Sequence, residues 1–256
     1  MIFYFSATGN SQRAAERIAE ALGDRCVSIG VAMRDKHFHY DITGDKYLGF
    51  VLPTFAYTLP GIAADFIGKL ELTGLSGQQV FGVFTCGEAT GSECAALGQV
   101  LSERNIPFHG GFDLVMQDNF IPWSDVPAPA AVRRRLDEAE QAIDRIIADL
   151  QAGKTGYLGS GVPEMLFLPY ERTDSLNGIG KMHADDKCVG CGLCAEMSPM
   201  GIIRIENGHA EFLGDCCACF TCLHRCPRQA VQYADATADK GRYVHPDVRF
   251  RTRNEY

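Results

Sequence analysis

Residues 1–22 read MIFYFSATGNSQRAAERIAEAL, and this stretch decides the fold of the first half of the chain. Residues 2–5 form a short apolar run of the kind found in buried strands. Residues 11–22 place Ala14, Ile18 and Leu22 on one face at helical spacing. A short loop rich in hydroxyl side chains separates the two segments. The pattern predicts a strand, a loop and a helix in direct succession.

The same alternation continues to about residue 150. Apolar runs at residues 46–53, 80–85 and 107–116 predict further strands. Helical spacing predicts helices at residues 61–70, 92–104 and 128–150. Strands that alternate with helices form a parallel sheet covered on both faces. The sequence therefore predicts a doubly wound α/β domain over residues 1–150.

The loop after the first strand has the composition of an anion-binding site. Backbone N–H groups and the helix dipole favour negative charge at a helix N-terminus. The loop has no lysine, so it is not an ATP-binding P-loop, and it does not match GxGxxG. Its hydroxyl groups could equally serve only as helix caps. The candidate residues are Ser6, Thr8, Gly9, Asn10 and Ser11.

The cysteines are concentrated in one segment. Of eleven cysteines, eight lie between Cys188 and Cys226. The chain shows no apolar run long enough to cross a bilayer and no signal peptide, so we expect it in the cytoplasm. Disulfides are disfavoured in that compartment, and clustered cysteines there indicate metal or redox chemistry.

The spacing of these cysteines points to iron–sulfur clusters. Residues 216–227 read CCACFTCLHRCP, a C-x2-C-x2-C-x3-C-P run in which the fourth cysteine binds the other cluster of a pair. Residues 188–199 read CVGCGLCAEMSP, with Ser198 in the fourth position. Structural zinc also uses CxxC pairs. It does not need two triplets with matching ends, so we favour iron and sulfide.

Residues 185–235 resemble the two-cluster bacterial ferredoxins, which implies a small α+β domain; a hairpin is expected at residues 202–212. By this resemblance a [4Fe-4S] cluster binds Cys188, Cys191, Cys194 and Cys226. The other cluster binds Cys216, Cys219 and Cys222, and its fourth ligand would be Ser198. That site could hold [4Fe-4S], with serine or water on the fourth iron, or [3Fe-4S]. Cys217, next to Cys216, is a further candidate ligand, but its side chain is expected to point away from the three-cysteine arc, which favours a bystander.

The loop at residues 6–11 resembles the phosphate loop of flavodoxins. Two further loops match in place, PTFAYTLP at residues 53–60 and TCGEATG at 85–91. The resemblance implies a flavodoxin-like sheet of order 2-1-3-4-5, with FMN bound where the strands end. The phosphate would lie on the first loop and the ring between the other two. The further contacts implied are Pro53, Thr54, Phe55, Ala56, Tyr57, Thr85, Cys86, Gly87 and Gly91. Phe55 or Tyr57 would stack on the ring, although ordinary loop packing is the alternative for both.

Taken whole, the chain resembles the flavodoxin–ferredoxin fusion proteins of anaerobic bacteria and archaea. This implies an FMN domain at residues 1–150, a linker at 151–184, a ferredoxin domain at 185–235 and a tail at 236–256. An apolar island at residues 165–170 is expected to pack on one domain or on both, and a membrane or partner contact is the less favoured alternative. The basic tail residues, Arg242 among them, are expected to be solvated, and a docking patch for an acidic partner is the less favoured alternative.

The resemblance implies an electron carrier that passes single electrons between FMN and the clusters, and on to an external redox protein or enzyme. The net charge of −8 argues against nucleic acid as a partner. One alternative is a flavin-dependent reductase with its own small substrate, for which Tyr57, Glu88 and His109 are proton-donor candidates without catalytic spacing. Another is a redox or oxygen sensor with a labile cluster. The sequence sets neither the direction of electron flow nor the oligomeric state.

Overall fold

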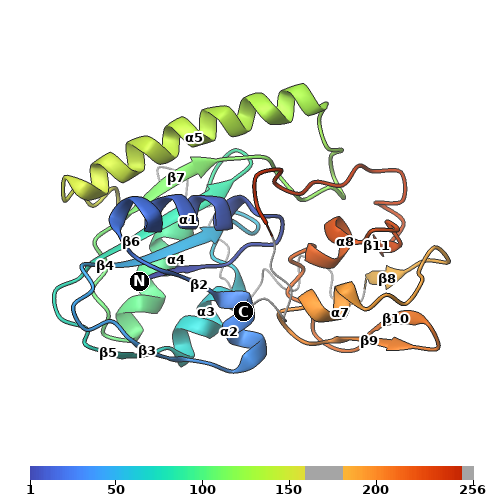
Figure 1. Cartoon of the computed structure of the whole chain (residues 1–256), viewed down its shortest axis with the longest axis horizontal. Helices are drawn as coiled ribbons and strands as arrows, with labels where there is room; N and C mark the ends of the chain where they lie inside the picture. Colours follow the sequence, from blue (N-terminus) through green and yellow to red (C-terminus); the bar gives the residue numbers. More distant parts are fainter. Residues whose placement is uncertain (159–180, 250–256) are drawn as a thin grey trace.

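The computed structural model describes residues 1–158 and 181–249. Most of the expected linker, with the apolar island at residues 165–170, lies outside the described residues, as does the end of the tail. Figure 1 shows a larger α/β domain followed by a smaller domain that carries most of the cysteines. None of the helices within the described ranges has the length and apolarity needed to cross a bilayer.

A five-stranded sheet forms the centre of the larger domain, in the order β2-β1-β4-β6-β7. All of its neighbouring strands run parallel. Counted along the chain, these strands have the order 2-1-3-4-5, so the expectation of a flavodoxin-like sheet is confirmed. The strands are β1 (Ile2–Tyr4), β2 (Cys26–Ser28), β4 (Tyr47–Pro53), β6 (Gln79–Cys86) and β7 (Gly111–Val115).

Helices cover both faces of this sheet because successive strand residues point to opposite sides. Ile2 and Val51 belong to one buried cluster, together with α1 (Asn10–Leu22) and α5 (Pro129–Gln151). Phe3 and Phe50 belong to the cluster on the other face. That face is covered by α2 (Ile29–Asp35), α3 (Gly61–Lys69) and α4 (Glu93–Glu103).

The four helices expected in this domain begin and end within one residue of the predicted positions. The last strand is shorter than predicted: it starts at Gly111, after the turn at Gly110, where φ is +128°. Short elements gave no clear pattern in the sequence. These elements are α2, β2 and a separate parallel pair, β3 (His39–Asp41) and β5 (Glu71–Thr73). In each strand of this pair the outer two residues are exposed and the middle one is half-buried.

The smaller domain is built from two antiparallel strand pairs and two short helices. The predicted hairpin is present as β9 (Ile203–Glu206) and β10 (His209–Phe212), and β8 (Met182–Ala184) pairs with β11 (Val231–Tyr233). Helices α7 (Leu193–Met197) and α8 (Thr221–Arg225) each begin between two cysteines of a triplet. The residue before each helix is left-handed, with φ of +80° at Gly192 and +59° at Phe220. The two halves of the domain therefore repeat in structure as they do in sequence.

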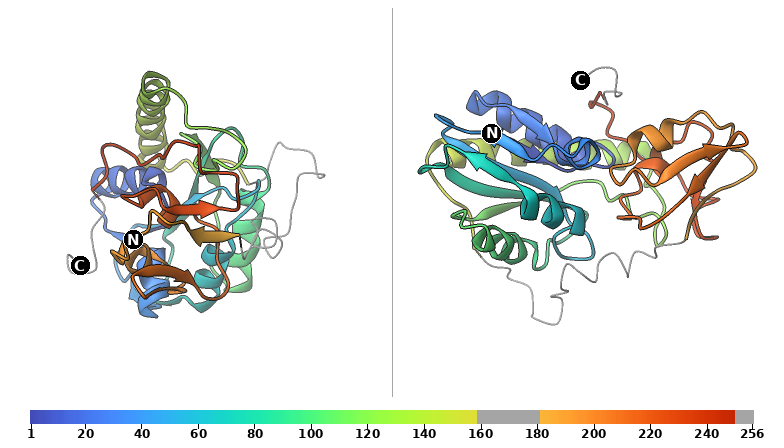
Figure 2. Two further views of the ribbon diagram at one scale, coloured as in Figure 1. Left: turned by 90° about the vertical axis from the view of Figure 1, so that its right-hand side faces the viewer. Right: turned by 90° about the horizontal axis from the view of Figure 1, so that it is seen from below.

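The two domains are in direct contact. Cys217 and Cys219 belong to the same buried cluster as Phe5 and Ile29 of the larger domain. The Arg34 guanidinium donates to the Glu196 carbonyl at 2.9 Å. Figures 1 and 2 show the smaller domain beside the edge of the sheet where the strands end. Any ligand at that edge would therefore lie close to the cysteine-rich domain.

Candidate functional site

Three loops meet at the edge of the sheet where β1, β4 and β6 end. They are loop 1 (residues 6–9), loop 2 (residues 54–60) and loop 3 (residues 87–92). The Thr54 N–H donates to the Thr85 carbonyl at 2.9 Å, and the Ser11 and Thr85 hydroxyl groups lie 2.8 Å apart. The structure thus brings the residues of the three expected loops to one edge. The Ser11 hydroxyl therefore already has one hydrogen-bond partner, and either group can be the donor.

Loop 1 turns sharply into the first helix. Gly9 has a φ of +105°, and its N–H donates to the Ser6 hydroxyl at 3.1 Å. No side chain caps α1, and within the described residues no backbone carbonyl accepts from the N–H groups of Asn10, Ser11 or Gln12. Such N–H groups are normally satisfied by side chains, water or a ligand. The geometry therefore suits an anion at the start of α1.

Loop 2 contains a strained turn. Phe55 and Thr58 exchange two backbone hydrogen bonds of 3.0 Å, and the residues between them, Ala56 and Tyr57, have φ values of +46° and +65°. This conformation normally selects glycine or asparagine, and each such residue costs about 1–3 kcal/mol. The turn leaves Tyr57 40% exposed, whereas Phe55 is half-buried with its ring 6.3 Å from that of Phe5. Tyr57 is therefore the more accessible of the two aromatic residues.

Loop 3 packs closely on this turn. Gly91 has a φ of +58°, and a Cβ atom placed there would lie 2.5 Å from Cβ of Tyr57. At Gly87, a Cβ atom would lie 3.0 Å from Cβ of Asp118. Burial raises the pKa of the Cys86 thiol to about 12, so this cysteine stays protonated near neutral pH. Both glycines permit backbone approaches that larger residues would obstruct.

One of the three proton-donor candidates, His109, does not lie near the three loops. His109 precedes β7, and its Nδ1 accepts from the N–H of Val80 at the start of β6, 2.9 Å away. It therefore lies at the edge where the strands begin, opposite the three loops. The expectation that His109 lies near the loops was wrong, because a residue at the start of a parallel strand lies at the edge opposite the loops that follow the strands. Glu88 remains in loop 3, where it is exposed.

Three buried polar atoms around the loops have no hydrogen-bond partner among the described residues. They are Oγ1 of Thr58, Oε1 of Glu93 and Nε2 of His245. Thr58 belongs to loop 2, Glu93 follows loop 3, and the His245 N–H donates to the Thr8 carbonyl of loop 1 at 2.8 Å. Buried polar atoms are usually satisfied, so unpaired ones at a single edge indicate a place for a polar ligand.

Glu93 lies beneath loops 2 and 3. Its Oε2 accepts from the Thr54 hydroxyl, which ties the two loops together. Burial raises the pKa of Glu93 well above its ordinary value, although the Thr54 hydrogen bond opposes this, and the nearby Asp113 carboxylate raises the pKa further. The surroundings of Glu93 therefore favour the protonated form of its carboxyl group. The sequence analysis did not identify it as a site residue.

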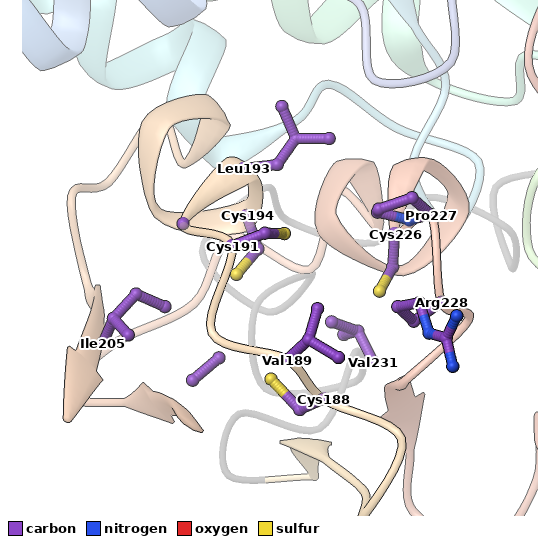
Figure 3. A pocket seen from close by; sticks show the side chains of 12 residues that line it. Cys188, Val189, Cys191, Leu193, Cys194, Ile205, Cys226, Pro227, Arg228 and Val231 are labelled. Carbon is purple, nitrogen blue, oxygen red and sulfur yellow. The ribbon is translucent and has the colours of Figure 1, made fainter. Parts of the chain in front are cut away.

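The first cysteine set surrounds a pocket in the smaller domain. Cys188, Cys191, Cys194 and Cys226 line it, together with apolar residues that include Ile205 and Val231. Figure 3 shows these four side chains around a common space. Burial raises the pKa of Cys194, and the other three cysteines raise it further, as expected for sulfur atoms that lie close together. The Ala230 N–H donates to Sγ of Cys226 at 3.3 Å.

The second set lies nearer to the larger domain. Burial raises the pKa of Cys222, and the charges of Cys219, Cys216 and Cys194 add to the effect. The Cys217 thiol donates to Cys219, and this hydrogen bond lowers the pKa of Cys219 to about 7 while it raises that of Cys217. This hydrogen bond joins Cys217 to the triplet formed by Cys216, Cys219 and Cys222.

Ser198 occupies the same structural position as Cys226. Each residue ends a short helix, with φ and ψ of −63° and 117° at Ser198 and of −65° and 117° at Cys226. Ser198 is buried.

Within the described residues, no three His, Cys, Asp or Glu side chains are arranged to hold a single metal ion. A cubane binds each cysteine through a different iron atom, so its ligands are spread more widely than those of a single ion.

The tail contributes residues that the sequence analysis missed. Arg242 is half-buried, and its guanidinium donates to the carbonyl groups of Leu223 and Thr237, each at 3.1 Å. The expectation of a solvated tail was therefore wrong for this residue. Tyr243 and His245 are buried against loop 1 and α1. No local motif indicates this contact, because the partners lie more than two hundred residues apart in the chain.

Comparisons with known proteins give limited similarity. No protein-family model and no curated protein matches the sequence. Among solved structures, the chain is 13% identical to the Trp repressor binding protein from Bacillus subtilis, with a TM-score of 0.36 over 57% of this chain and 96% of that one. It is 16% identical to the flavodoxin of Streptococcus pneumonia TIGR4, with a TM-score of 0.31 over 56% and 96%. It is 15% identical to rubredoxin oxygen:oxidoreductase from Desulfovibrio gigas, with a TM-score of 0.31 over 59% and 36%. TM-scores of this size carry no inference about fold or function, so the flavodoxin-like assignment depends on the sheet order alone.

Proposed function

We propose that this chain is an electron-transfer protein that passes single electrons between FMN and iron–sulfur clusters, and on to an external redox partner. The observation that carries the proposal is the position of Cys219. This residue belongs to a C-x2-C-x2-C-x3-C-P run, and it packs in the same buried cluster as Phe5 and Ala7, where β1 leads into loop 1. A cluster ligand thus lies in the core that supports the flavin loops.

The three loops suit FMN in particular. The open N–H groups at the start of α1 suit a phosphate, and the exposed Tyr57 offers a face for the ring. The unpaired atoms of Thr58, Glu93 and His245 add hydrogen-bonding capacity at the same edge. The absence of a lysine in loop 1 disfavours ATP.

The two cysteine sets suit two clusters. Cys188, Cys191, Cys194 and Cys226 would hold a [4Fe-4S] cluster, and their pocket is lined otherwise by mostly apolar residues and by Arg228. Cys216, Cys219 and Cys222 would hold the other, as [4Fe-4S] or [3Fe-4S], with Ser198 in the fourth position. When bound, FMN supplies two electrons one at a time, and each cluster accepts one of them.

The burial of the two cysteine sets suggests the order in which electrons would pass through the two clusters. Cys219 packs in a buried cluster of the larger domain and Cys222 is also buried, so their cluster would be proximal to FMN. Cys191 is exposed, and the neighbouring Val189 is 59% exposed. The cluster of that set would therefore be distal and would face the external redox protein. Covalent linkage of the domains raises the effective concentration of donor and acceptor.

Anaerobic purification followed by FMN, iron and sulfide analysis tests the proposal. We expect about one FMN and about seven or eight irons per chain, the two values that a [3Fe-4S] or a second [4Fe-4S] cluster would give. After rapid reduction of the flavin, stopped-flow absorbance and freeze-quench EPR should show cluster reduction within one chain, at a rate independent of protein concentration. Zinc in place of iron, or a rate that rises with concentration, would contradict the proposal.

A further inference from the structure

The tail crosses from the smaller domain to loop 1. We call residues 242–247 the strap. Its first residue, Arg242, is anchored in the smaller domain, where its guanidinium donates to Leu223 O at 3.1 Å and to Oε1 of Gln232 at 3.1 Å. Figure 1 shows this dark red segment passing from α8 towards α1. The strap therefore links the domain that carries the cysteines to the loop that suits a phosphate.

Tyr243 connects two functional elements directly. Its N–H donates to Nδ1 of His224 in α8 at 3.1 Å, and its hydroxyl donates to Oδ1 of Asn10 in the first turn of α1 at 2.6 Å. Asn10 is held on its other side, because its Nδ2 donates to the Gln117 carbonyl at 2.7 Å. Tyr243 is only 3% exposed. The side chain of Asn10 is thus fixed at the end of loop 1.

His245 presents an unused donor beside loop 1. Its backbone N–H donates to the Thr8 carbonyl at 2.8 Å. Its Nδ1 accepts from the Asp247 N–H at 3.2 Å, so a neutral ring must carry its proton on Nε2. Burial lowers the pKa of His245, which keeps the ring neutral near neutral pH. Nε2–H is therefore a donor, and it is buried without an acceptor among the described residues in a side chain 2% exposed.

The charged groups around this ring are already paired. Glu140 accepts from Arg13 at 2.8 Å and also from Arg17. The Arg133 guanidinium lies 3.2 Å from the Asp247 carboxylate. Although Glu140 and Asp247 are near enough to act on His245 electrostatically, no carboxylate within residues 1–158 and 181–249 accepts a hydrogen bond from its Nε2–H. A phosphate on loop 1 is an acceptor of the required kind.

We propose that the strap forms part of the FMN phosphate site. His245 donates from Nε2–H to the phosphate, and Tyr243 is a positioning residue that holds Asn10 and loop 1 in place. The inference rests on the proposed function, since it requires that loop 1 binds the phosphate of FMN. It goes further by assigning part of the flavin site to residues that follow the ferredoxin domain in the chain.

A comparison of FMN with riboflavin, which has no phosphate, tests the assignment. The full-length protein is freed of flavin with its clusters intact, and binding is followed by the quenching of flavin fluorescence. We expect His245→Phe to weaken FMN binding by about tenfold or more, and riboflavin binding by less than about twofold. His245→Gln retains a side-chain N–H donor and should recover part of the loss. Inorganic phosphate should protect loop 1 from hydrogen exchange in the wild type more than in His245→Phe.

Tyr243→Phe removes only the hydroxyl that bonds Asn10 and should weaken FMN binding by about threefold to tenfold. Tyr233→Phe is the matched control, since Tyr233 is also a buried tyrosine of the smaller domain but is not in the strap. Equal losses for FMN and riboflavin in His245→Phe, or unchanged FMN binding, would overturn the inference while the proposed function stands. A wild-type protein that binds no FMN would overturn both.

Discussion

The Ser92 N–H donates to the carbonyl oxygen of Tyr57 at 2.8 Å, and this hydrogen bond seats loop 3 on the strained turn of loop 2. Gly91, which precedes Ser92, has no room for a side chain there. We expect Gly91→Ala to displace the turn and to weaken FMN binding by about tenfold or more, since it combines a positive φ with a backbone clash. Fluorescence titration of the flavin-free protein measures the change.

The control for this variant is Gly68→Ala. Gly68 lies within α3, and a Cβ atom there would meet nothing within 4 Å. Alanine should stabilise that helix by up to about 1 kcal/mol and leave FMN binding unchanged. If both variants bind FMN as the wild type does, the two loops do not form the ring site.

Glu93→Gln should remove a pH-dependent loss of stability. The ordinary pKa of this carboxyl group is 4.5, and burial raises it well above that value in the folded chain. Above pH 4.5 the unfolded chain therefore releases a proton that the folded chain retains, so stability falls as pH rises towards the raised pKa. In that window the wild type should lose about 1.4 kcal/mol per pH unit relative to Glu93→Gln.

Urea unfolding between pH 5 and pH 8, followed by circular dichroism, would measure this difference. Glu103→Gln at the exposed end of α4 is the control, and its stability should run parallel to that of the wild type. A Glu93→Gln curve that also runs parallel to the wild type would mean that Glu93 ionises normally in the folded protein.

Cys217→Ala and Cys219→Ala should differ sharply in their iron content. Cys219 occupies a ligand position, so its loss should remove or convert the proximal cluster. Cys217→Ala should keep all the iron but lower the reduction potential of that cluster, because the thiol of Cys217 no longer donates to the sulfur of Cys219. EPR-monitored redox titration of both variants measures the effect. Iron loss in Cys217→Ala would instead identify it as a ligand.

Ser198 and Cys226 allow a reciprocal exchange, because they share one backbone conformation. Ser198→Cys should give about eight irons per chain and the EPR spectrum of two all-cysteine [4Fe-4S] clusters. Cys226→Ser should move the serine ligand set to the distal site and shift the potential of that cluster instead. If Ser198→Cys leaves both iron content and spectrum unchanged, the side chain at position 198 does not reach the cluster.

The spacing of apolar residues predicted the helices whose buried faces repeat along the sequence. The apolar spacing of Ala14 and Ile18 located α1, and the same logic located α5 through Leu136 and Ile143. Elements of three residues, such as β3 and β5, bury too little to leave a pattern. The loop residues of the candidate flavin site were named from their resemblance to the flavodoxin loops, and the parallel strands bring these loops to one edge.

Other features depend on tertiary structure and could not be predicted. Glu93 resembles an ordinary first-turn acid in sequence, and only the packing of α4 beneath the loops buries it. The basic residues near Arg242 suggested a solvated tail, since no local signal shows that Arg242 finds backbone carbonyls in another part of the domain. The contact of Tyr243 with Asn10 joins residues 233 positions apart, far beyond any sequence periodicity.

The hydrogen bond between His245 and Thr8 also bears on how the protein is made. Synthesis proceeds from the N-terminus, so loop 1 leaves the ribosome on the order of ten to fifty seconds before the strap that binds it. Every cysteine of the two cysteine sets is made within that interval. Under the proposed function, the edge that would hold FMN can be closed only after the cysteine-rich segment is complete. The connectivity of the chain thus orders its synthesis, with the cysteine-rich segment made before the strap that reaches loop 1.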